Sequence, residues 1–222
     1  MQTFLPLPDL RASLEVLDDK RLGKQRVETF QILRALTWPR YAWKNHPAVR
    51  MWRGFIPALV AYGVANCDVW TARGYADTVR DSLLQWTGGA EPDWERLRER
   101  GQLPPWLGVP ELHVSHQSAL VRKDPSYYRA HFPDVPDDLP YWWPPDVFPR
   151  WPARRPAGAS GPLPVPAALD ALGLEVSRAG QAEGVDAVGE GRDVLATMRP
   201  GHGGSTTGLL AGLSLGHAVA LS

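Results

Sequence analysis

The residues best suited to chemistry lie near the amino terminus, in a charged run that reads Leu17-Asp-Asp-Lys-Arg-Leu-Gly-Lys-Gln-Arg-Val-Glu28. At about 100° per residue on a helix, Arg21 and Glu28 fall within roughly 20° of each other, and Lys24 lies about 40° away. A lone carboxylate on a cationic helix face is either a salt-bridge partner on a solvated surface or an acid/base group that works on a bound polyanion.

The terminal amine of Met1 is a second reactive group, because this charged run begins less than thirty residues from it. An α-amine loses its proton near pH 8 in an unperturbed peptide, well below a lysine side chain. Neighbouring cations favour the neutral, nucleophilic form of such an amine. Met1, Glu28 and the cations Arg21, Lys24 and Arg26 therefore form one candidate site.

Cations alternate with aromatic residues in the run Trp43-Lys44-Asn-His46-Pro-Ala-Val-Arg50-Met-Trp-Arg53. This pattern suits contacts to a phosphate backbone combined with base stacking. The alternative is a helix start with buried tryptophans and solvated arginines. Arg26 differs from these residues, because it projects close to the apolar stripe of its helix, and a half-buried arginine usually pairs with a carboxylate or a phosphate.

The spacing of His113 and His116 could chelate a metal, but no third ligand lies nearby in the sequence. We therefore expect packed or hydrogen-bonded histidines, no metal and no cofactor. The single cysteine, Cys67, stands at helical spacing from Val64 and Trp70, which predicts a buried thiol rather than a nucleophile.

The charge of the chain is balanced overall, with 24 basic and 24 acidic residues, but it is unevenly distributed. Residues 11–53 carry ten Lys or Arg and four acids, whereas residues 54–151 carry nine bases and thirteen acids. A basic patch on a neutral protein is typical of a surface that meets phosphates. One cysteine, no signal peptide and no long apolar run predict a cytoplasmic protein without a membrane span.

The hydrophobic pattern predicts an all-α fold, with one compact helical domain over residues 1–150. We expect helices over residues 18–36, from Pro47 to Gly74 with a kink or break at Pro57, after Asp77, and from Leu112 to Lys123. Residues 151–222 contain no aromatic residue after Trp151 and no lysine. This composition predicts a Pro/Gly/Ala-rich tail that is largely disordered, with one possible helix over 166–177, after a linker within residues 149–156.

Three blocks of the chain resemble, in order, the pyrimidine-dimer DNA glycosylase family, small helical enzymes of the phage endonuclease V type. They are Leu17–Glu28, then His46 with the long helix to Arg73-Gly-Tyr75, then Ser115-His-Gln-Ser-Ala-Leu-Val-Arg-Lys-Asp-Pro-Ser-Tyr-Tyr128. The resemblance covers about residues 1–145. A group of bacterial proteins that begin Met-Gln-Thr-Phe-Leu-Pro resembles the chain still more closely.

The resemblance implies a DNA repair glycosylase with an associated β-elimination (AP lyase) activity. Met1 would supply the amine that attacks the sugar, and it would be retained because Gln2 is too bulky for ordinary methionine removal. Glu28 would handle protons and stabilise the cationic sugar. The cations that the resemblance implies in binding and bending the duplex are Arg21, Lys24, Arg26, His46, Arg50, Arg122 and Lys123.

Lys44 and Arg53 complete the predicted DNA-binding set, through the alternating run described above. The expected partner is double-stranded DNA, with no membrane, no obligate protein partner and a monomeric chain that associates with the nucleoid. The rival interpretation is a non-catalytic nucleic-acid-binding domain that keeps the glycosylase fold. A metal-dependent hydrolase that uses His113 and His116 is a more distant alternative.

Overall fold

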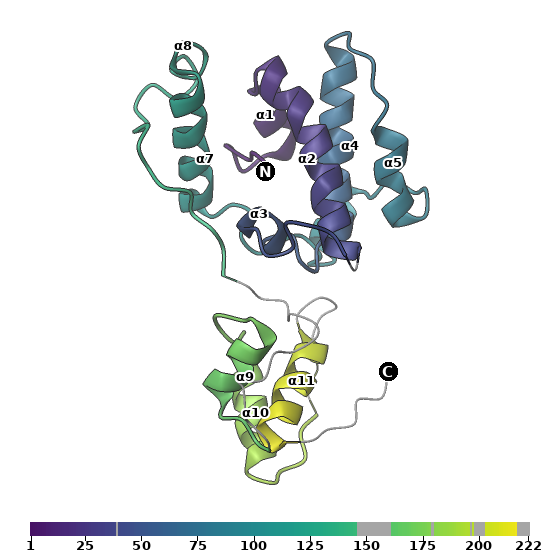
Figure 1. The fold of residues 1–222 in the computed structure, drawn as a ribbon, viewed down its shortest axis with the longest axis vertical. Helices are drawn as coiled ribbons and strands as arrows, with labels where there is room; N and C mark the ends of the chain where they lie inside the picture. The colour runs from purple at the N-terminus through teal and green to yellow at the C-terminus, as the bar shows by residue number, and fades with distance from the viewer. Residues whose placement is uncertain (39, 146–160, 179, 196, 198–202, 217–222) are drawn as a thin grey trace. The chain divides into compact units, whose positions relative to one another are not determined.

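The computed structural model describes residues 1–38, 40–145, 161–178, 180–195, 197 and 203–216. Every regular element within these residues is a helix and none is a strand, which confirms the all-α prediction (Figure 1). The chain divides into two units, Met1–Pro144 and Pro145–Ser222. The predicted linker over residues 149–156 lies outside the described residues.

The first unit carries eight short or medium α-helices and one 3-10 helix among its described residues: α1 (Leu10–Glu15), α2 (Asp19–Thr37), α3 (Pro47–Arg50), α4 (Ile56–Ala72), α5 (Arg80–Leu84), η1 (Gln85–Thr87), α6 (Trp94–Glu99), α7 (Pro110–Lys123) and α8 (Pro125–Tyr128). The helices described in the second unit are α9 (Val165–Leu172), α10 (Gln181–Gly189) and α11 (Gly204–Leu215).

The predicted helix over residues 18–36 is α2, which begins where Asp18 caps it by accepting from the Arg21 backbone N–H at 3.0 Å. The predicted break at Pro57 is also present. Because proline in a helix interior removes a hydrogen bond and clashes with the preceding turn, the chain forms α3, turns at Gly54 with φ of 84°, and starts α4 with Pro57 in its first turn. Helices α1, α6 and α8 were not predicted.

Helix α4 is the centre of the first unit and packs against α1, α2 and α5 (Figure 1). Its apolar residues are buried on more than one side, including Leu59, Val60, Val64 and Cys67. A Cβ atom at Gly63 would lie 2.7 Å from side-chain atoms of both Thr29 and Leu83. The absence of a side chain at this position lets α2 and α5 approach α4 closely, which fixes α2 in place.

Burial and the carboxylate of Asp77 raise the pKa of the Cys67 thiol to about 12. Cys67 is thus an inert part of this core, as its spacing indicated.

The amino-terminal segment is extended, and residues 2–6 are buried between α2 and α7. No strand among the described residues pairs with it, and side chains satisfy its backbone. The Leu5 N–H donates to His116 Nδ1 at 3.0 Å, and the Leu5 carbonyl lies 2.8 Å from His113 Nδ1. Gln117 donates to the Pro6 carbonyl at 2.7 Å. Three residues of one face of α7 therefore hold the segment.

In the second unit, α9, α10 and α11 enclose a small cluster of Ala, Leu and Val side chains that includes Ala168, Leu172, Val185 and Leu210. The sequence indicated one helix here, and the structure describes three. Aliphatic spacing along α10 and α11 is weak because glycine interrupts both helices. Disorder of this region in solution stays a prediction. Among the described helices, none has the length and apolar character that crossing a membrane requires.

A chain that ends at Pro145 is expected to keep the cooperative melt of the first unit, because α4 and the helices around it bury their apolar faces within that unit. Circular dichroism with thermal unfolding measures this directly. Loss of a cooperative transition on truncation would mean that residues 146–222 belong to the same folding unit.

Burial, with a smaller effect of nearby His113, lowers the pKa of His116 to about 3 from an ordinary 6.5. The unfolded chain therefore takes up the proton first as pH falls. The stability contributed by the neutral ring is complete above pH 6.5 and is lost as pH falls from there towards 3, at about 1.4 kcal/mol per pH unit.

Urea unfolding at a series of pH values tests this expectation. His116→Asn, which keeps an acceptor near Nδ1 but does not titrate, should flatten the pH dependence between 6.5 and 4. His131→Asn, at an exposed histidine, is the control and should leave it unchanged. Parallel curves for all three proteins would contradict the assignment.

Candidate active site

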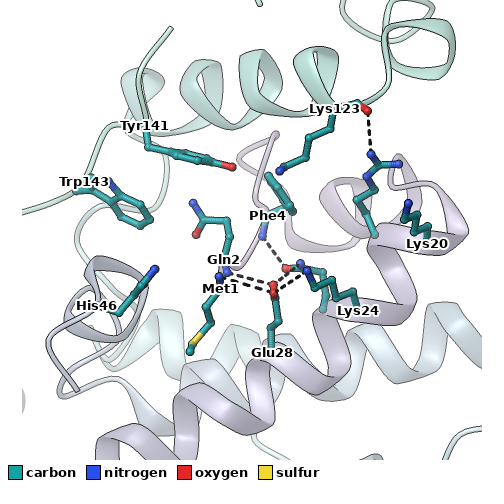
Figure 2. A pocket seen from close by; sticks show the side chains of 12 residues that line it. Met1, Gln2, Phe4, Lys20, Lys24, Glu28, His46, Lys123, Tyr141 and Trp143 are labelled. Carbon is teal, nitrogen blue, oxygen red and sulfur yellow. Dashed lines mark hydrogen bonds and ion pairs between the residues drawn. The ribbon is translucent and has the colours of Figure 1, made fainter. Parts of the chain in front are cut away.

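A cavity of about 520 Å³ opens where the amino-terminal segment meets α2 (Figure 2). Residues from five separate parts of the first unit line it: Met1, Gln2, Phe4, Lys20, Arg21, Lys24, Gln25, Glu28, His46, Lys123, Tyr141 and Trp143. The two predicted catalytic residues, Met1 and Glu28, are both among them.

The terminal amine of Met1 lies 3.8 Å from Glu28 Oε1, and the Glu28 side chain is only 10% exposed. The other oxygen of Glu28 accepts from the Gln2 backbone N–H at 3.1 Å. Lys24 Nζ, on a side chain that is 70% exposed, lies 3.5 Å from Oε1. The carboxylate therefore sits at the inner end of the cavity, within reach of the amine and of one cation.

Gln25 connects the terminus to Glu28. Its carbonyl oxygen accepts from the Phe4 backbone N–H and from the Tyr62 hydroxyl, both at 2.8 Å, and its amide nitrogen donates to Glu28 Oε2 at 3.3 Å. Because Gln25 and Glu28 are three residues apart on α2, both side chains reach the same face. One helical turn thus positions both the terminus and the carboxylate.

His46 closes the cavity from another element and also begins α3. Its Nδ1 accepts from the Ala48 backbone N–H at 3.1 Å, as expected for a capping residue before Pro47. Partial burial, followed by the positive Met1 amine, holds the pKa of His46 below its ordinary value, while Glu28 acts in the opposite direction. The ring is therefore neutral at pH 7 and keeps its Nε2 proton.

Four cations line the cavity: Lys20, Arg21, Lys24 and Lys123. Arg21 also ties α2 to α7, since it pairs with Asp18 at 3.2 Å and donates to the Lys123 carbonyl at 3.0 Å. Lys20, Lys24 and Lys123 are exposed at the rim. A polyanion that enters the cavity meets these side chains before it reaches Glu28.

The other predicted DNA-binding residues do not line the cavity. Arg26 pairs with Asp77 and lies over the Trp70 ring, 4.4 Å from its centroid, so its carboxylate partner is within the protein. Lys44 donates to the Ala35 carbonyl at 3.0 Å, and Arg53 donates to the Lys44 carbonyl at 3.3 Å. Arg50 lies in the last turn of α3.

Arg122 likewise does not line the cavity and instead binds backbone carbonyls of the chain. It donates to the Asp137 and Leu139 carbonyls at 2.9 and 3.3 Å. A DNA contact of Arg26, Lys44, Arg50, Arg53 or Arg122 stays a prediction.

His113 and His116 anchor the amino-terminal segment, with His113 also accepting from the Gly108 backbone N–H at 3.1 Å. Within the residues that the structure describes, no cluster of three potential metal ligands occurs. Both imidazoles instead hydrogen-bond to the backbone of Leu5, so they act on the site by positioning the amino-terminal segment.

Six cavity residues were missed in the sequence: Gln2, Phe4, Lys20, Gln25, Tyr141 and Trp143. The two glutamines carry no periodic or charge signal. Tyr141 and Trp143 lie in an aromatic run, Tyr141-Trp-Trp143, which could have drawn attention as a candidate contact surface. Because they lie more than a hundred residues from Glu28 in the sequence, nothing indicated that they line the same cavity.

No curated protein and no solved structure matches the chain. A family model described as pyrimidine dimer DNA glycosylase matches residues 1–83. The matched segment contains the amine of Met1, the carboxylate of Glu28 and the capping His46, all of which line one cavity. Over residues 1–83, the chain is similar to the pyrimidine dimer DNA glycosylase family.

Proposed function

We propose that the first unit is a DNA repair glycosylase with an associated AP lyase activity, which acts on pyrimidine dimers or similar base damage in duplex DNA. The observation that carries the proposal is the terminal amine 3.8 Å from a nearly buried carboxylate, in a cavity with a cationic rim. The similarity of residues 1–83 to the pyrimidine dimer DNA glycosylase family supports the same class of substrate. Its place of action would be the nucleoid, in the cytoplasm.

In the first step, the lone pair of the Met1 amine forms a bond to C1′ of the damaged nucleotide. The bond from C1′ to the base breaks, and the base leaves with the electron pair and gains a proton. Glu28 is placed to accept a proton from the attacking amine and to stabilise positive charge on the sugar. The amine supplies the nucleophile and the carboxylate supplies the proton acceptor, so this step needs no metal.

In the second step, the C1′–O4′ bond opens and the amine nitrogen and C1′ become an imine. Removal of a C2′ proton then expels the 3′ phosphate by β-elimination, and water hydrolyses the imine to return the free amine. Glu28 is again the nearest carboxylate that can move these protons. The flanking phosphates would be bound by the ammonium groups at the rim of the cavity, which belong to Lys20, Lys24 and Lys123.

Borohydride trapping on a duplex with one abasic site tests the function. Reduction converts the imine to a stable amine bond, so the enzyme becomes covalently attached to the strand. A non-catalytic DNA-binding domain with this fold would bind the duplex and form no adduct.

Glu28→Gln is expected to lower the rate of base release from dimer-containing duplex by about 10²- to 10⁴-fold, since it keeps the shape and removes the proton acceptor. The affinity for DNA should be retained or should increase, because a negative charge leaves a cationic cavity. Single-turnover strand cleavage and fluorescence anisotropy measure the two quantities.

Glu15→Gln is the matched control. Glu15 is an exposed residue of α1 and pairs with Arg11 at 2.8 Å, outside the cavity. It should leave the rate and affinity unchanged. A rate for Glu28→Gln within about threefold of the parent protein would remove the carboxylate from the mechanism.

A further inference from the structure

We propose that Tyr141 and Trp143 form a stacking subsite for the nucleobase of the attacked nucleotide. The inference rests on the proposed function, and it assigns a specificity role to residues outside the family match. Figure 2 shows Tyr141, Trp143 and His46 on one side of the cavity and Lys20, Lys24 and Lys123 on the other, with Met1 and Glu28 between them. The two sides therefore differ in chemistry.

The aromatic side is a continuous series of rings. Trp143 lies edge-to-face with His46 at 6.3 Å between centroids, and 5.4 Å from Tyr141. Tyr141 meets His116 edge-to-face at 5.9 Å, which continues the series into the buried core. These contacts hold the rings against one another, and both Tyr141 and Trp143 line the cavity.

At the surface the series continues to Trp43, which lies 5.8 Å from His46. Trp43 is 61% exposed and has a φ of 70°, a conformation that a bulky side chain rarely adopts. Aromatic surface thus runs without interruption from solvent to the cavity interior.

The segment that carries the two rings is held against α7. Ser118 Oγ accepts from the Leu139 backbone N–H at 3.1 Å, and Arg122 donates to the Asp137 and Leu139 carbonyls. Arg129 donates to the Val135 carbonyl at 2.6 Å and to the Asp137 carboxylate at 2.9 Å. The rings are therefore presented in a fixed place before any ligand binds.

The aromatic side of the cavity, formed by Tyr141, Trp143 and His46, is called the aromatic wall, and the side with the lysines is called the cationic wall. The position of the Met1 amine decides which group of the DNA contacts the aromatic wall. The sugar carbon that is attacked must approach the Met1 amine, and the base is bonded directly to that carbon. Phosphates on either side of the sugar are drawn to the cationic wall. The base is left to face Tyr141 and Trp143, whose ring faces suit an unstacked nucleobase.

The Tyr141 hydroxyl adds a hydrogen-bonding group to the wall. Burial raises the pKa of Tyr141, with Glu28 acting in the same direction and Arg122 in the opposite one. The hydroxyl therefore stays protonated at neutral pH and can donate to a base carbonyl. The family model ends at residue 83, so Tyr141 and Trp143 lie outside the matched segment.

Affinity measurements in the full chain with Glu28→Gln, which keeps the DNA intact, test the subsite. Two duplexes are compared: one with a single cis-syn thymine dimer and one with a tetrahydrofuran abasic analogue at the same position, which has the sugar but no base. Trp143→Leu keeps bulk and removes the ring. It is expected to weaken binding of the dimer duplex by about 5- to 100-fold and that of the analogue duplex by less than twofold.

The matched control is Trp142→Leu, at a neighbouring tryptophan that is not among the residues lining the cavity, and it should leave both affinities unchanged. Trp143→Phe should recover most of the loss, and Tyr141→Leu supplies a second variant if Trp143→Leu does not give a cooperative melt. Equal losses on both duplexes, or no loss on either, would overturn the subsite. Failure of the parent protein to be trapped on abasic DNA would instead refute the proposed lyase chemistry. The affinity comparison would still decide whether Tyr141 and Trp143 bind the base.

Discussion

The first unit depends on one constraint, the burial of an extended backbone segment that has no strand beside it. Residues 2–6 are removed from water, and each unpaired N–H or C=O there would cost about 1–3 kcal/mol. Side chains from three helices meet this requirement: Gln25 and Glu28 on α2, Tyr62 on α4, and His113, His116 and Gln117 on α7. Since these bonds fix the segment residue by residue, they also fix the position of the terminal amine.

Stability and chemistry share the same groups here. Glu28 accepts the Gln2 N–H as part of the fold, and its other oxygen faces the amine and the cavity. Gln25 holds the backbone of Phe4 and also the carboxylate. A substitution at either residue is therefore expected to disturb both the segment and the reaction geometry, which makes an isosteric change such as glutamate to glutamine the informative one.

Local physics made part of this arrangement predictable. Helical periodicity placed Arg21, Lys24 and Glu28 on one face of a helix, and all three line the cavity. The preference of proline for the first turn of a helix predicted a helix that begins at Pro47, and α3 does begin there, with His46 as its cap. The exclusion of proline from helix interiors predicted the break that separates α3 from α4. Each of these signals depends only on residues that are close together in the sequence. For that reason each could be recognised without the tertiary structure.

Long-range partners could not be predicted in the same way. The extended terminus has no alternating pattern, because its partners are side chains about a hundred residues away and not another strand. Arg26 was expected to meet a carboxylate or a phosphate, and only the packing of α2 against α4 and the following turn shows that Asp77 is the partner. The aromatic wall has the same origin, since Tyr141 and Trp143 reach the cavity through a segment pinned to α7.

The central claim is that the amine of Met1 is the nucleophile. It is tested most directly by locating the covalent bond in the borohydride-trapped adduct. Trypsin releases residues 1–11 as a peptide that contains no lysine, so an adduct found on it by mass spectrometry must be on the terminal amine. The account predicts the reduced sugar on this peptide. An adduct on a peptide containing Lys20 or Lys24, with the terminal peptide unmodified, would contradict it.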